Sequence, residues 1–112
     1  MSSSATGHFI AQRASAIALV ALGLWFAVSV STLDSLAYGS FMEFLAAPFN
    51  NIALMLLCAT LAYHSYLGVQ VVIEDYVHGP RLAWFSLVMS RAVHLALGLL
   101  MVYTVYDIGF GA

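Results

Sequence analysis

Three ionisable side chains lie inside long apolar stretches of the sequence: His64, Arg91 and His94. An arginine at the centre of a membrane-spanning helix costs about 2.5–3.5 kcal/mol on insertion scales, so each such residue is a hypothesis of function. A neutral imidazole can ligate a metal, including haem iron. A guanidinium can pair with a carboxylate.

The first of these histidines, His64, opens the segment HSYLGVQVVIEDYVHG, which runs on to Glu74, Asp75 and Tyr76. Because an α-helix turns by about 100° per residue, positions 64, 68, 71 and 75 share one helix face. Gly68 leaves room on that face for something flat beside the histidine. These residues fit a haem whose iron is bound by His64. They also fit a histidine that hydrogen-bonds a neighbouring helix, with Gly68 permitting close helix packing.

The second histidine, His94, lies about as deep in its apolar stretch as His64 does, and Gly98 follows it four residues later. Two such histidines on adjacent antiparallel helices could ligate one haem within a single chain. Alternatively, Arg91 and His94 share one side of a helix and could contact haem propionates or a buried acid on a partner. A further interpretation is that Arg91 and His94 make a polar contact between helices. In each case we expect Arg91 to point into a protein interior and not into lipid.

Two carboxylates and a phenol, Glu74, Asp75 and Tyr76, stand together at the end of the second apolar stretch. A phenol donor beside carboxylates could bind the carbonyl of a lipid-soluble quinone and help to deliver protons to it. A solvated helix end with an interfacial tyrosine is the alternative. Trp25 and Trp84 are expected to be interfacial or core aromatics.

The composition identifies the medium around these residues. Of 112 residues, 63% are hydrophobic and 7% are charged, whereas about 25% of an ordinary soluble domain is charged. So much apolar side chain must face lipid or other apolar helices. The three arginines, the absence of lysine and a net charge of −2 give no indication of a nucleic-acid partner. The single cysteine, Cys58, is expected to be a small buried hydrophobe.

Three uncharged or nearly uncharged stretches are long enough to cross a bilayer, which takes about 20 apolar residues. We predict an all-α membrane protein with one domain, residues 1–112, and helices at approximately 14–35, 48–75 and 82–106. The first dozen residues are expected to form a loosely ordered or surface-lying tail, and residues 38–47 to form a connecting loop. Asp107, Gly109 and Gly111 are expected to close the third helix.

The arginines near the helix ends predict the orientation. Arg13 precedes the first span and Arg81 lies in the turn between the second and third spans, so both are on the same side of the membrane. The loop between the first two spans contains Glu43 and no arginine. The positive-inside rule therefore places the N-terminus in the cytoplasm and the C-terminus in the periplasm or intermembrane space.

The pattern H-x3-G-x6-D-Y-V, from His64 to Val77, resembles the signature of the smaller hydrophobic anchor subunit of succinate dehydrogenase, or respiratory complex II. The resemblance extends to the segment QRASAIAL at positions 12–19, to the three-span layout and to the chain length. It thus covers nearly the whole chain, although its specific part is about fourteen residues long.

The resemblance implies a site shared between chains. In that family two anchor subunits form a bundle that holds one haem b, each providing one axial histidine, and they dock a flavoprotein and an iron–sulfur subunit. His64 matches the haem ligand, Tyr76 matches the tyrosine that hydrogen-bonds ubiquinone, and Asp75 matches its neighbouring acid near the proton path. The second ligand would then come from the partner anchor, which makes His94 a residue beside the site and not an iron ligand. A bacterial inner membrane is the expected location.

The chain is not expected to oxidise succinate itself, because it has no flavin fingerprint and no set of cysteines for an iron–sulfur cluster. Two alternatives to the anchor reading stay open at this point. One is a self-contained b-type cytochrome with both iron ligands, His64 and His94, in one chain. The other is a non-redox membrane scaffold whose buried histidines serve packing.

Overall fold

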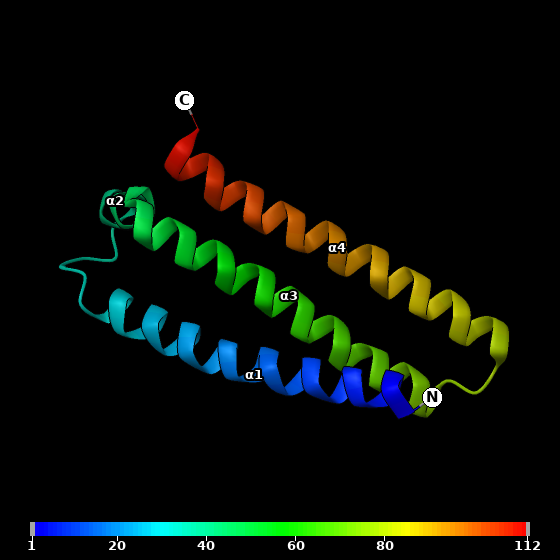
Figure 1. The fold of residues 1–112 in the computed structure, drawn as a ribbon. Coiled ribbons are helices and arrows are strands. Elements are labelled where there is room, and N and C mark those ends of the chain that lie inside the picture. The colour runs from blue at the N-terminus through cyan, green and yellow to red at the C-terminus, as the bar shows by residue number, and fades with distance from the viewer. Residues whose placement is uncertain (1, 112) are drawn as a thin grey trace.

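The computed structural model describes the backbone of residues 2–111 and the side-chain surroundings of residues 5–111. These residues form four helices and no strand: α1 (Ser2–Ser31), α2 (Tyr38–Ala46), α3 (Pro48–Tyr76) and α4 (Pro80–Phe110) (Figure 1). Helices α1, α3 and α4 are long and apolar enough to cross a membrane. The predicted all-α fold with three spans is confirmed.

The three long helices lie side by side, with α3 in the middle (Figure 1). Helix α3 packs against both α1 and α4, whereas α1 and α4 do not contact each other. The beginning of α1 and the turn between α3 and α4 lie at one end of the bundle, and α2 and the end of α4 lie at the other. The arrangement of three spans expected from the apolar stretches is therefore present.

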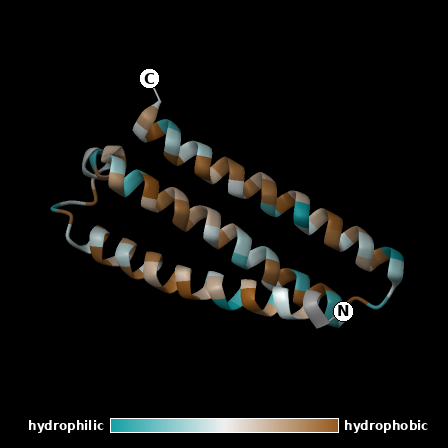
Figure 2. Cartoon of the chain, in the orientation of Figure 1, coloured by the Kyte–Doolittle hydropathy of each residue, from teal (hydrophilic) through white to brown (hydrophobic). Residues whose placement is uncertain are grey.

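Hydrophobic residues recur along the whole length of the three long helices (Figure 2). Large hydrophobic residues such as Ile17, Leu56 and Leu99 are exposed, whereas only six apolar residues among those described are buried. Such a surface is untenable in water and suits a hydrocarbon solvent, in which apolar side chains need no cover. The chain is therefore embedded in a membrane.

Helix α2 is a feature that the sequence analysis missed, because residues 38–47 were expected to be a loop. Its nine residues include Phe44 and Leu45, which are buried against Leu54 of α3 and Val105 of α4. Trp25 of α1 stacks on Phe44 with ring centroids 6.0 Å apart. This cluster closes one end of the bundle and accounts for Trp25 as a core aromatic.

Three helix ends differ by four residues or more from those expected. Helix α1 ends at Ser31 and not at residue 35. The supposed N-terminal tail is helical, since α1 begins at Ser2; no proline interrupts it, and a continuing helix satisfies its own backbone groups. Helix α4 runs past Asp107 and Gly109 to Phe110. Of the residues expected to close this helix, Gly111 is its C-cap, whereas Asp107 and Gly109 lie inside the helix and Gly109 is a contact point.

Asn51 explains the close approach at Gly109. Its side chain is fully buried, and its Nδ2 donates to the carbonyl oxygens of Leu45 at 2.8 Å and of Val105 at 2.7 Å. A β-carbon at position 109 would lie 2.8 Å from the Asn51 Cγ. The asparagine thus joins α2, α3 and α4, as polar side chains often do between membrane helices.

Candidate functional site

His64 lies in the middle part of α3 and is held by α1. The Oγ of Ser15 lies 2.8 Å from its Nδ1, and the serine is buried, with 6% of its surface exposed. The Nε2 atom of His64 has no hydrogen-bond partner among the described residues and is not an enclosed atom. One ring nitrogen is therefore fixed inside the chain, and the other is available to a group outside it.

Gly68 follows one helical turn after His64 and faces open space. A β-carbon built at this position meets no other atom within 4 Å. Gly98, which the sequence places similarly after His94, is different: its β-carbon would lie 3.2 Å from that of Ala62. Gly68 therefore leaves room on the surface of the chain, whereas Gly98 brings α4 close to α3.

His94 has both ring nitrogens engaged within the chain. Its Nδ1 lies 2.8 Å from the carbonyl oxygen of Ser90, so Nδ1 carries the proton and donates it. The Oγ of Ser65 lies 3.1 Å from Nε2 and donates to it. His94 thus contacts α3 from the α4 side, while His64 contacts α1. The ring nitrogens of the two histidines therefore do not converge on a common position where one iron could bind.

Arg91 is exposed on this chain. Its Nε donates to the hydroxyl of Tyr66 at 3.4 Å, and no carboxylate among the described residues lies within ion-pair distance. The expected protein interior around Arg91 is therefore not built by this chain alone.

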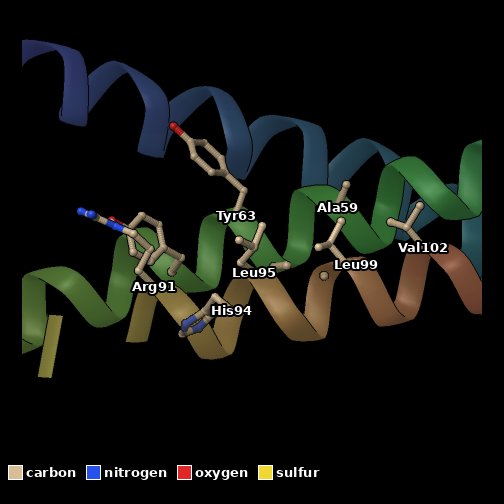
Figure 3. A pocket seen from close by; sticks show the side chains of 10 residues that line it. Ala59, Tyr63, Arg91, His94, Leu95, Leu99 and Val102 are labelled. Carbon is tan, nitrogen blue, oxygen red and sulfur yellow. The ribbon is translucent and has the colours of Figure 1, made fainter. Parts of the chain in front are cut away.

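A cavity of about 430 Å³ opens between α3 and α4, with Arg91 and His94 in its lining (Figure 3). The remaining lining is apolar or aromatic and includes Tyr63, Tyr66 and Leu99. Sequence reasoning missed the two tyrosines, although their spacing of three residues places them on one side of a helix. His64 and Gly68 do not line this cavity.

Asp75 and Tyr76 are exposed at the end of α3, and Tyr76 keeps 75% of its surface accessible. Neither side chain has a hydrogen-bond partner among the described residues, whereas Gln70 Nε2 donates to Glu74 Oε2 at 3.2 Å. Tyr76 lies twelve positions after His64 on the same helix, which is a rise of about 18 Å. The structure thus keeps the histidine and the phenol on one helix but well apart.

The described residues contain no cluster of three or more side chains that could hold a metal ion. An axial position on a haem iron needs only one histidine from a chain. His64, with one ring nitrogen open, could supply one such histidine.

The profile of a protein family, described as the succinate dehydrogenase/fumarate reductase transmembrane subunit, matches residues 1–105. The chain belongs to this family. Its layout of three long apolar helices agrees with a transmembrane subunit, and the family resemblance drawn from the His64–Val77 pattern is confirmed.

Curated relatives of this family carry the name succinate dehydrogenase hydrophobic membrane anchor subunit. The one from Rickettsia felis is 36% identical over 74 residues, which cover 66% of this chain and 62% of the relative. The one from Rickettsia prowazekii is 31% identical over 81 residues, which cover 72% of this chain and 65% of the relative. The matched part of the chain thus spans less than two thirds of the length of these relatives.

Proposed function

We propose that this chain is an anchor subunit of a succinate:quinone oxidoreductase that binds haem b jointly with a second anchor subunit and forms part of the ubiquinone-reduction site. Family membership supports the anchor role. The observation that carries the haem assignment is the ring of His64, whose Nδ1 is held by Ser15 while Nε2 is unpaired.

The residues around His64 fit a haem. An unpaired imidazole nitrogen in hydrocarbon is costly, and coordination to iron would satisfy it. Gly68, with open space where a side chain would be, lets a flat macrocycle lie against α3. Because both ring nitrogens of His94 are engaged, a second histidine for the haem would come from the partner anchor. A bound haem b would supply one-electron redox chemistry.

The end of α3 suits a quinone. The exposed phenol of Tyr76 can donate a hydrogen bond to a quinone carbonyl, and the neighbouring carboxylate of Asp75 can pass protons from water. Quinone reduction consumes protons, so a site at the membrane–water boundary beside titratable groups favours it. We assign Tyr76 to quinone binding and Asp75 to the proton path.

The distribution of the arginines supports an orientation with this end of the bundle in the cytoplasm of a bacterium and the chain in the inner membrane. The iron–sulfur and flavoprotein subunits would then dock on this side, where electrons reach the quinone. Arg91, which meets no carboxylate within the described residues, is assigned to an anionic group outside this chain, either an acid of the partner anchor or a haem propionate.

The haem assignment is tested on the purified complex by its reduced-minus-oxidised spectrum. His64→Ala is expected to abolish the b-type band, whereas His94→Ala is expected to keep it, because His94 bonds only to serines of this chain. Equal loss of the band in both variants would refute the shared-ligand arrangement. Absence of a b-type band from the wild-type complex would remove the haem altogether.

The quinone assignment is tested separately with Tyr76→Phe, which removes the phenol hydroxyl and nothing else. Quinone reduction by succinate is expected to fall about two- to twelvefold, because the loss of one hydrogen bond to the quinone costs about 0.5–1.5 kcal/mol. Succinate oxidation with an artificial acceptor that takes electrons from the soluble subunits serves as the control and should stay near the wild-type rate. Unchanged quinone turnover contradicts the role of Tyr76.

A further inference from the structure

A single side-chain hydrogen bond joins α1 to α3 in the described part of the chain, and it ends on His64. Its other partner is Ser15, whose Oγ lies 2.8 Å from the Nδ1 of His64 and 3.1 Å from the carbonyl oxygen of Gln12. Ser15 is one of only two buried polar residues among those described. The position of the hydroxyl proton therefore decides the direction of both contacts.

The proton of Ser15 can serve only one of its two contacts. The carbonyl oxygen of Gln12 can only accept, so the Ser15 hydroxyl must donate to it if that contact is a hydrogen bond. The contact with His64 is then a hydrogen bond only if Nδ1 carries a proton and donates it to the Ser15 oxygen. This assignment alone satisfies both contacts, and it leaves a lone pair on Nε2.

We propose that Ser15 is the positioning residue for the haem ligand: it fixes the ring orientation and the Nδ1-protonated tautomer of His64 and so presents the Nε2 lone pair to iron. This inference rests on the proposed role of His64. The backbone of α1 takes part as well, because the Gln12 carbonyl holds the serine proton away from the ring. One turn of α1 thereby determines which nitrogen of a histidine on α3 can coordinate.

The contact should also influence the iron electronically. A hydrogen bond from the far ring nitrogen raises the basicity of the coordinating nitrogen. A more basic ligand stabilises ferric iron relative to ferrous iron and so lowers the reduction potential. Loss of the Ser15 oxygen should therefore raise the potential of the haem, and the affinity for haem should fall by about 10- to 100-fold, as is usual for such outer partners.

The test is a potentiometric titration of the b-type band in the purified complex carrying Ser15→Ala, Ser15→Thr or Ser31→Ala. Ser31→Ala is the matched control, because Ser31 donates to the carbonyl oxygen of Val28 in the same helix and is remote from His64. Ser15→Ala is expected to raise the haem potential and lower haem occupancy. Ser15→Thr keeps the hydroxyl and should restore both properties, and Ser31→Ala should change neither.

An unchanged potential and spectrum in Ser15→Ala overturn the inference. A purely structural role would lower the amount of assembled complex without moving the potential of the haem that remains, and this result also overturns it. If Ser15→Ala retains no haem, Ser15→Cys replaces it, because sulfur is a weak acceptor of similar size. An upward shift in that variant supports the inference, and the wild-type potential contradicts it.

The inference and the proposed function fail in different ways. Loss of the b-type band in His64→Ala, together with an unchanged potential in Ser15→Ala, refutes only the positioning role. A b-type band that persists in His64→Ala refutes the haem assignment of His64 itself, whatever Ser15→Ala does.

Discussion

A larger side chain at Gly68 should weaken haem binding without destabilising the fold of the chain. In the chain itself, a β-carbon at this position meets nothing within 4 Å, so the first carbon of a leucine side chain introduces no clash with α1 or α4. Replacing glycine by leucine within a helix even favours the helix by up to about 1 kcal/mol. Against a haem on this face, the same side chain overfills the contact, which costs about 1–3 kcal/mol. Haem retention should therefore weaken by about five- to 150-fold.

The assay is the ratio of haem b to flavin in the purified complex carrying Gly68→Leu. Gly23→Leu is the matched control, because Gly23 also lies inside a long helix and its β-carbon would also meet nothing within 4 Å. We expect Gly68→Leu to lose haem while its membrane level stays near wild type, and Gly23→Leu to keep both. A wild-type ratio of haem to flavin in Gly68→Leu would show that no macrocycle lies against this face.

Three further changes address the packing of the chain, and each is read from loss of helicity on denaturant titration in mild detergent. Asn51→Ala removes two hydrogen bonds to carbonyl oxygens and should destabilise the fold by about 1–3 kcal/mol; an unchanged midpoint would contradict the role of Asn51 as a junction. Phe44→Ala empties the cluster around α2 and should cost about 3–5 kcal/mol, whereas an effect near zero would mean that α2 does not close the bundle. Ser65→Ala deletes the donor to His94 and should cost about 0.6 kcal/mol without changing the b-type band; a loss of that band would place His94 in the haem site.

The three spans could be predicted from the sequence because each depends on local composition alone. A run of about 20 apolar residues has few alternatives to a transmembrane helix. Pro48 marks the start of α3 for an equally local reason, since proline at the first turn gives up no backbone hydrogen bond. Pro80 begins α4 in the same way, although the sequence analysis placed the start of this helix at residue 82.

Features that depend on how helices face one another were not predictable in this way. The role of Ser15 depends on the rotation of α1 against α3, and 49 residues separate the serine from His64. His94 and His64 looked alike because each has a glycine four residues later, and only the packing of α4 on α3 distinguishes Gly98 from Gly68. Helix α2 had a weak signal, since Phe41, Phe44 and Leu45 follow helical spacing, but nine residues are too few for periodicity to stand out.

The arrangement of the helices supports the proposed binding of a cofactor from outside the chain at His64. Since α1 and α4 lie on different sides of α3 and do not touch, α3 is left uncovered along the edge that contains Gly68. In hydrocarbon, an imidazole nitrogen on that edge would go without a partner, at a cost of about 2–7 kcal/mol by transfer measures. Ser15 engages Nδ1 and so leaves Nε2 as the atom that must be satisfied from outside. An isolated chain bears that cost in full, and the proposed haem, shared with a second anchor, would remove it, so we expect assembly and cofactor binding to stabilise each other.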